Sequence, residues 1–226
     1  TRRRWWDMAF IGGSVVATFF QGVTLGGFIA GVAVKDGRYA GGGLDWLTPF
    51  SAFTGLGLLA TYALLGSTWL VMKTEGLLQL RMRLLARSLA WVLLLLIGAI
   101  SVWTPLAHER VAERWFTWPN IIWFLPVPLL VALAMIGLSR ALRSSRDSAA
   151  FVYTLALVFL GYSGLGISLW PNIVPPALSI YDAAGPPQSL GFALVGALLI
   201  IPLILMYTAW GYWVFRGKVR RGDGYH

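Results

Sequence analysis

The residues that can carry chemistry in this chain are two histidines, nine acidic residues and a few polar side chains embedded in long apolar stretches. A haem or metal centre within a membrane needs ligands such as histidine at the depth of the bilayer. His108 and His226 both lie outside the apolar stretches, and the sequence contains no cysteine. We therefore expect no catalytic residue, no metal site and no haem held by this chain alone.

The acidic residues predict no proton relay inside the membrane, because all nine lie at the edges of apolar stretches, in loops or in the tail. Asp182 differs from the others because it lies in a Pro-rich loop between the last two apolar stretches. Two interpretations are open for it. It caps the start of the last apolar stretch, or it pairs with a basic residue of a partner subunit.

Gln21 is the best single candidate among the embedded polar residues, because a primary amide deep in an apolar stretch needs a hydrogen-bond partner. The simpler interpretation is a hydrogen bond between two helices. The alternative is contact with a quinone head group or with a water-lined path.

The elements that position these residues are apolar stretches long enough to cross a bilayer. The chain is 58% hydrophobic and 12% charged, which is outside the range of soluble domains. A spanning helix needs about 20 residues, and the stretches lack the period-two alternation of barrel strands. The sequence predicts an all-α, polytopic helical membrane protein with a single membrane domain over residues 1–226. Six spans are expected, at residues 8–34, 46–72, 88–103, 120–138, 150–170 and 190–215.

The basic residues recur in short clusters between these spans, so the net charge of +9 indicates topology and no binding of nucleic acid. Most of them fall on one side of the predicted bundle, which we expect to be cytoplasmic together with both ends of the chain. These residues are Arg2, Arg3, Arg4, Lys73, Arg81, Arg83, Arg87, Arg140, Arg143, Arg146, Arg216, Lys218, Arg220 and Arg221. The opposite side carries only Lys35, Arg38, Arg110 and Arg114, and it is rich in tryptophan and proline.

Small residues predict where helices approach one another closely. Gly22 and Gly26 are spaced as GxxxG in the first span, and Gly164 and Gly166 lie near the end of the fifth. In lipid such residues let two backbones pack together. The contact is either within this chain or with another subunit or a lipid-like cofactor. The candidates for a subunit interface are Gly22, Gly26, Gly164, Gly166, Trp170 and Asp182.

Four longer blocks follow one another along the chain: QGVTLGGFIAG, DWLTPFSAFTGLGLLATYALLGSTWLVMKTEG, GYSGLGISLWPNIVPP and IPLILMYTAWGYWVFRGKV. They resemble subunit II of the cytochrome bd quinol oxidase family, including its cyanide-insensitive branch. The resemblance covers nearly the whole chain and is weakest between residues 90 and 149. Four blocks in the right order make it specific.

The resemblance implies the non-haem subunit of a complex in the bacterial cytoplasmic membrane that oxidises quinol and reduces oxygen to water. In that family the haems b and d and the quinol site belong to subunit I. Subunit II supports the haem-bearing subunit and helps to form paths for oxygen or protons at the interface, where quinone and membrane lipid are further partners. Family members carry several helices before the stretch that begins RRRWWD here, so we expect the C-terminal portion of a longer subunit.

A membrane transporter or channel subunit is the alternative function. Helices broken by glycine and proline occur at transport sites, and SGLGISLWPNIVPP has that composition. A transporter usually places ionisable groups near the middle of the membrane, however, and the predicted spans of this chain have almost none.

Overall fold

The computed structural model describes residues 2–35, 37–144 and 146–219, and a helix forms most of each predicted span. Six segments of the described chain are long and apolar enough to cross a membrane, which confirms the predicted fold class. The helices are α1 (Arg2–Ala30), α2 (Pro49–Lys73), α3 (Gly76–Ala107), α4 (Glu109–Phe116), α5 (Asn120–Phe124), α6 (Pro126–Arg143), α7 (Asp147–Leu169) and α8 (Pro187–Val214).

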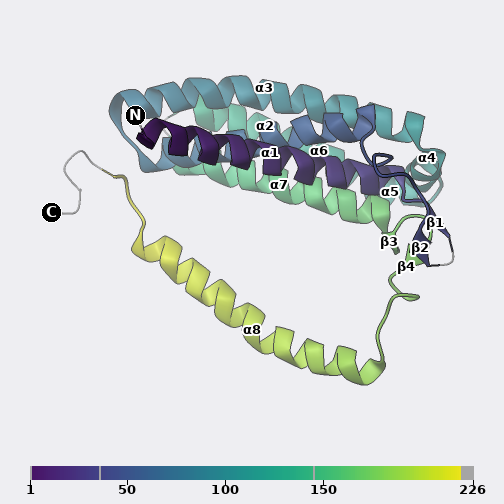
Figure 1. Ribbon diagram of the computed structural model, residues 1–226. Helices are drawn as coiled ribbons and strands as arrows, with labels where there is room; N and C mark the ends of the chain where they lie inside the picture. The colour runs from purple at the N-terminus through teal and green to yellow at the C-terminus, as the bar shows by residue number, and fades with distance from the viewer. Residues whose placement is uncertain (1, 36, 145, 220–226) are drawn as a thin grey trace.

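Two short antiparallel hairpins complete the secondary structure, and both lie at the same end of the helices (Figure 1). The first joins β1 (Val34–Lys35) to β2 (Arg38–Tyr39), and the second joins β3 (Asn172–Val174) to β4 (Leu178–Ser179). Strand pairing satisfies backbone groups outside the spans, where the chain turns back. The irregular parts of the described backbone are therefore confined to the ends of the helices.

The third span differs most from the sequence prediction. The sequence predicts residues 88–103, whereas α3 covers Gly76–Ala107. The prediction stops at Arg81, Arg83 and Arg87 because charged side chains are unfavourable in hydrocarbon. The helix continues through them because its backbone hydrogen bonds do not depend on side-chain polarity. Long arginine side chains also reach polar partners beyond the apolar region.

Two other spans also differ: α1 begins at Arg2, before the predicted start at residue 8, and α6 continues to Arg143, beyond the predicted end at residue 138. The first is predicted at residues 8–34, and α1 ends at Ala30 because Gly31 adopts a φ of 98°, in the left-handed region that ends many helices. The fourth is predicted at residues 120–138, and the structure divides it into α5 and α6 at Pro126, which has no N–H to donate. The other three predicted spans agree with α2, α7 and α8 to within one helical turn.

Five of the long helices form a bundle in which α2 packs against α1, α3 and α7, and α6 packs against α7 and α3. Leu64 of α2, Ala90 of α3, Leu138 of α6 and Leu157 of α7 are buried in a shared apolar core. These side chains pack where four helices meet, so the core holds α2, α3, α6 and α7 together.

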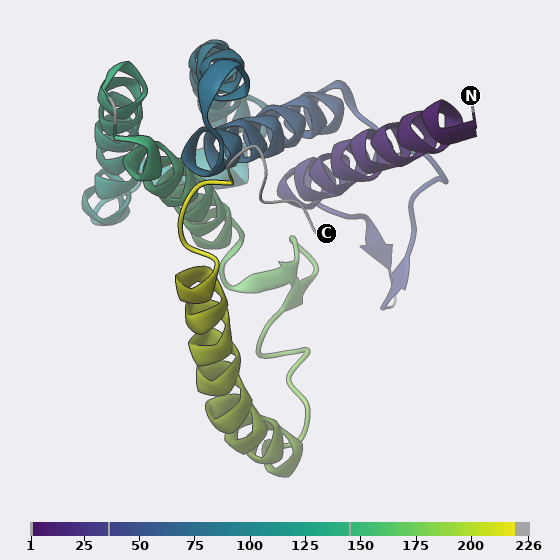
Figure 2. The same ribbon diagram turned by 90° about the vertical axis from the view of Figure 1, so that its left-hand side faces the viewer.

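The helix α8 stands apart from this bundle, as two perpendicular views show (Figures 1 and 2). None of its 28 residues is buried. Its C-terminal end touches the bundle, where the rings of Tyr212 and Trp69 meet edge to face with centroids 5.8 Å apart. The remainder of α8 offers apolar side chains on every side, which is a composition that needs lipid or protein around it.

The contact between α1 and α2 depends on the glycines that the sequence analysis identified. A Cβ atom at Gly22 would lie 2.7 Å from the Cα of Gly55, and one at Gly26 would lie 2.6 Å from the Cα of Ser51. The two backbones are thus too close for larger residues. The Thr54 hydroxyl uses this proximity to donate a hydrogen bond to the carbonyl of Gly22 at 2.8 Å.

We expect Gly26→Leu to separate α1 from α2, because the added side chain meets backbone of α2 and cannot move aside. Overpacking of this kind destabilises a fold by about 1–3 kcal/mol or more. Thermal unfolding of the purified protein in detergent, followed by tryptophan fluorescence, measures the effect. Gly12→Leu in the same helix is the matched control, because a Cβ there meets nothing within 4 Å. Equal melting of the two variants would contradict the assignment.

Candidate functional site

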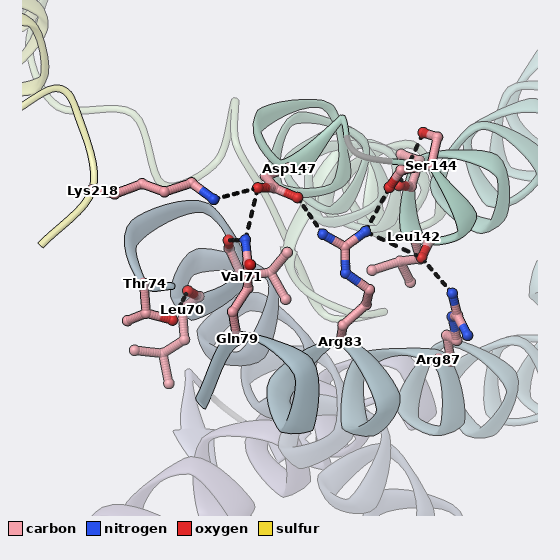
Figure 3. Close-up of polar contacts among 11 residues, drawn as sticks. Leu70, Val71, Thr74, Gln79, Arg83, Arg87, Leu142, Ser144, Asp147 and Lys218 are labelled. Carbon is pink, nitrogen blue, oxygen red and sulfur yellow. Dashed lines mark hydrogen bonds and ion pairs between the residues drawn. The ribbon is translucent and has the colours of Figure 1, made fainter. Parts of the chain in front are cut away.

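The most extensive side-chain network in the described chain surrounds Asp147, the first residue of α7 (Figure 3). Its carboxylate accepts hydrogen bonds from Lys218 Nζ at 2.6 Å and from Gln79 Nε2 at 2.7 Å, and it forms an ion pair with the guanidinium of Arg83. The side chain of Asp147 is only 14% exposed. One half-buried acid therefore joins α3, α7 and the segment after α8.

The same network satisfies the end of α6. Arg87 Nη2 donates to the carbonyl of Leu142 at 2.7 Å, and Arg83 Nη1 donates to the carbonyl of Ser144. These carbonyls lie at the C-terminal end of a helix, where the last carbonyls have no partner within the helix and where positive charge is favourable. Gln79 also donates to the carbonyl of Val71 at 2.9 Å, which brings in α2.

This arrangement has the properties of a clamp and not of a reaction centre. Both carboxylate oxygens of Asp147 already accept hydrogen bonds, and the arginines are engaged with backbone carbonyls (Figure 3). A general base needs an open position beside it for the proton it takes. We will call Gln79, Arg83, Arg87, Asp147 and Lys218 the Asp147 cluster.

The segment that follows α8 is attached to the bundle at this cluster. The Val219 N–H donates to the carbonyl of Lys73 at 2.8 Å, and Lys73 Nζ donates to the carbonyl of Phe215. These bonds join the last turn of α2 to the chain just after α8. Together with the ion pair of Lys218, they fix the C-terminal end of α8 while the rest of that helix stands free.

Gln21 lies on an exposed face of α1, and its closest side-chain partner is the hydroxyl of Tyr62 on α2, at 3.5 Å from Oε1. A cavity of about 150 Å³ lies deeper, between α1, α2, α3 and α7. Its wall is mostly leucine and isoleucine, with polar contributions from Thr61 and Tyr162, and it does not include Gln21. The Thr61 hydroxyl donates to the carbonyl of Gly57 in its own helix. A contact of Gln21 with quinone or a water path stays a prediction.

The structure separates the glycine candidates into two groups. Gly22 and Gly26 face α2 of the same chain, so their contact here is intramolecular. Gly164 faces Val127 of α6 at an ordinary distance of 3.8 Å, and a Cβ at Gly166 would meet nothing within 4 Å. Gly166 is therefore open to an additional occupant, and a subunit contact at these positions stays a prediction.

The loop candidates lie at the hairpin end of the molecule. Trp170 ends α7 with an exposed ring that meets the ring of Tyr181 edge to face, with centroids 6.5 Å apart. Asp182 accepts hydrogen bonds from the hydroxyl and the N–H of Ser179, which hold the pKa of its carboxyl below the usual value. The helix α8 begins after Pro186 without a side-chain cap. The interpretation of Asp182 as that cap is therefore wrong, and its pairing with a partner subunit stays a prediction.

Sequence reasoning missed the roles of Asp147 and Arg114. Asp147 is one acid among several at helix edges, and its partners, which include Gln79 and Lys218, are far from it in sequence, so only the fold brings them together.

Arg114 of α4 lines an open cavity of about 320 Å³ with Phe124, Gly166 and Trp170. The available signal was charge asymmetry, because arginine is uncommon on the side of a membrane protein that carries few basic residues.

Comparison with known proteins gives a consistent result. The sequence model of a family described as cytochrome bd terminal oxidase subunit II matches residues 1–215. Cytochrome bd-I ubiquinol oxidase subunit 2 of Escherichia coli K12 is 29% identical over 98% of this chain and 67% of its own length. A probable cytochrome oxidase subunit 2 of Haemophilus influenzae is 25% identical over 97% of this chain and 67% of its own length. Cytochrome bd ubiquinol oxidase subunit 2 of Bacillus subtilis is 24% identical over 95% and 64%, respectively.

We expect Asp147→Asn to release the segment after α8 from the bundle, because the amide carries no charge to hold Arg83 and Lys218. Losing charge-assisted hydrogen bonds at a partly exposed site should destabilise the fold by about 1–3 kcal/mol. A single cysteine placed at Val219, in a chain that otherwise has none, should become more reactive toward a water-soluble maleimide.

Glu75→Gln is the matched control for this prediction, because Glu75 is an exposed acid of the α2–α3 turn at the same end of the bundle. Its substitution makes the same change of charge without touching the cluster. If both variants raise the maleimide reactivity equally, the general charge of this end and not the Asp147 cluster holds the tail.

Proposed function

Because this chain belongs to the family of cytochrome bd terminal oxidase subunit II, we propose that it is the non-haem subunit of a complex that oxidises quinol and reduces oxygen to water. The relatives named as ubiquinol oxidase subunits support the choice of substrate class. The family and the six apolar helices make this a multi-pass protein of the bacterial inner membrane. A transporter subunit is not favoured by either comparison.

The structural observation that carries the proposal is the isolation of α8. A spanning helix normally packs on its neighbours through small residues and shape complementarity. Here α8 is anchored at its C-terminal end by the Asp147 cluster and, at its other end, follows the loop that carries β3 and β4, yet none of its residues is buried. We propose that helices of the partner oxidase subunit pack against it.

The haems b and d belong, on this proposal, to the partner subunit. Axial haem ligands are usually histidine, methionine or cysteine. Both histidines of this chain lie outside the predicted spans, and it has no cysteine. Met135 and Met206 lie in spans, but a lone methionine in a helix is more often core filling than a ligand. This chain then supplies a rigid, apolar surface around the haem-bearing subunit. Such a surface keeps water away from the reaction centre and strengthens electrostatic interactions inside it.

We place a bound quinone at the interface between the two subunits, with Gln21 as its candidate contact. Gln21 is exposed on α1 and its amide is only loosely engaged by Tyr62. A quinone carbonyl can accept a hydrogen bond from such an amide. Gly164 and Gly166 on α7, and Trp170 and Asp182 in the loop after it, are further candidates for contact with the partner subunit.

We also propose that the end of the bundle with the Asp147 cluster faces the cytoplasm. The ends of α2, α6 and α8 and the starts of α1, α3 and α7 gather there (Figure 1), and they carry the basic clusters. Excess lysine and arginine in short connections marks the cytoplasmic side. Arg220 and Arg221, which belong to the same pattern, lie outside the described residues.

A cysteine scan along α8 tests the subunit contact. Single cysteines at Leu194, Leu198, Ile201 and Leu205 follow one helical stripe, and the intervening positions follow the others. After coupling to a photoreactive maleimide in native membranes, adducts with a second oxidase polypeptide should rise and fall with a period of 3.6 residues. A cysteine at Thr54, which is buried between α1 and α2, should give no such adduct. Uniform coupling to lipid around α8 would refute the contact.

Purification from native membranes tests the oxidase assignment itself. The complex should show the visible absorption of haem, and the haem should remain with the second polypeptide after the subunits are separated. Gly166→Leu should reduce the amount of assembled haem complex, because the new side chain projects into open space beside α7. Gly98→Leu on α3, also in open space, is its control. A haem-free chain that moves a solute would contradict the proposal.

A further inference from the structure

We propose that the open cavity beside Arg114 binds the phosphate head group of an anionic phospholipid from the outer leaflet. The cavity has a volume of about 320 Å³ and is lined by Arg114, Phe124, Gly166, Ile167 and Trp170. It combines one cationic side chain with apolar and aromatic walls, which matches a lipid whose head is charged and whose tails are hydrocarbon. The site shares Gly166 and Trp170 with the proposed subunit contact, so we place the lipid between α7 and the partner subunit; its binding is measured without reference to haem or oxidase activity.

One N–H group of the Arg114 guanidinium has no hydrogen-bond partner in the described chain, whereas the guanidinium of Arg110 has one. The Nε atom of Arg114 is buried and makes no hydrogen bond to any described residue. One turn earlier on the same helix, Arg110 donates to the carbonyl of Ile29 at the end of α1, at 3.3 Å. A buried donor without a partner is unfavourable by about 1–3 kcal/mol. The other N–H groups of the same guanidinium can donate to a phosphate in the cavity, because phosphate matches the planar fork of arginine.

The charge of Arg114 is also uncompensated within the described chain. Both ion pairs found there involve Asp147, at the opposite end of the bundle. Burial lowers the pKa of Arg114 from its ordinary value, but an arginine side chain remains charged at neutral pH. A positive charge that has no ion-pair partner in the described chain and lines a cavity with apolar walls favours an anion over a zwitterion, whose own ammonium group would be repelled.

The backbone around Arg114 is fixed by its neighbours. Asn120 Nδ2 donates to the carbonyl of Arg114 at 3.1 Å, and the indole of Trp115 donates to the Ser168 hydroxyl at 3.1 Å. The Ser168 hydroxyl in turn donates to the carbonyl of Gly164 at 2.8 Å. These bonds hold α4 against the last turns of α7, so the arginine is positioned before any ligand arrives.

The depth of the cavity suits a lipid head group. It lies where α7 ends at Leu169 and the loop begins with Trp170, a residue that is 52% exposed. Tryptophan prefers the boundary between the hydrocarbon and the head groups. Gly166 leaves the cavity open below this level, since a Cβ there meets nothing within 4 Å. An acyl chain can therefore descend past Phe124 and Ile167 along α7.

Native mass spectrometry of the purified protein with whatever subunits accompany it tests the site. After delipidation, phosphatidylglycerol added back should bind about tenfold more tightly than phosphatidylcholine of the same chain length, as one charge-assisted hydrogen bond predicts. Arg114→Gln should abolish that preference for one bound lipid. Arg38→Gln is the matched control, because Arg38 lies in an exposed hairpin at the same end of the helices and loses the same charge.

Each outcome decides the proposal. Equal binding of the two lipids by the unchanged protein would overturn it, whether or not the Arg114→Gln variant folds. Equal loss of preference in both variants would also overturn it, because the effect would then come from overall charge. Displacement of phosphatidylglycerol by inorganic phosphate at millimolar concentration would show a free-anion site instead of a lipid site.

Discussion

The constraint on which this structure depends is that hydrocarbon offers no hydrogen-bond partner to a peptide group. Each backbone N–H and C=O within the membrane must be satisfied within its own segment, so the apolar stretches form helices. The described strands, turns and breaks all lie at the ends of those helices. Most polar contacts therefore lie at the two ends of the bundle. The two ends satisfy the free backbone groups at the helix termini in different ways.

The basic end satisfies its backbone with charged side chains. The last carbonyls of α6 accept hydrogen bonds from Arg83 and Arg87, and Asp147 neutralises Arg83 and Lys218. The opposite end contains the two hairpins and is rich in tryptophan and proline. There Arg110 donates to a backbone carbonyl, and Arg114 lines an open cavity. Cytoplasmic connections tolerate many basic residues, whereas outer connections carry few. The charge asymmetry that supports the proposed orientation also distinguishes the two ends: charged side chains hold one together, and aromatic residues surround the other.

How much of this follows from the sequence depends on the range of the interaction. Hydropathy is local, so the six spans and the all-α class are predictable, and the ends of α2, α7 and α8 are nearly right. The start of α3 is not, because hydropathy registers where charge begins and not where helical hydrogen bonding stops. The Asp147 cluster could not be predicted, because Gln79 and Lys218 are distant in sequence. They reach the carboxylate of Asp147 only when the fold brings α3 and the segment after α8 to the start of α7. The open space at Gly166 could not be predicted either, because the position of a glycine in the sequence does not say whether it already has a neighbour.

The contrast between α1 and α8 then explains how the same apolar composition serves two purposes. In α1, Gly22 and Gly26 let the backbone approach α2 so closely that the Thr54 hydroxyl donates a hydrogen bond to the carbonyl of Gly22. That face of α1 is therefore already packed within the chain. In α8, Gly191, Gly196 and Gly211 meet nothing within 4 Å. Hydrophobicity alone gives no drive for helices to associate in lipid, so close approach at small residues must supply the contact energy. On the proposed function, a helix with unused small-residue positions and a fixed C-terminal end associates with another chain at a smaller loss of conformational entropy, because its position is already restricted before the partner arrives.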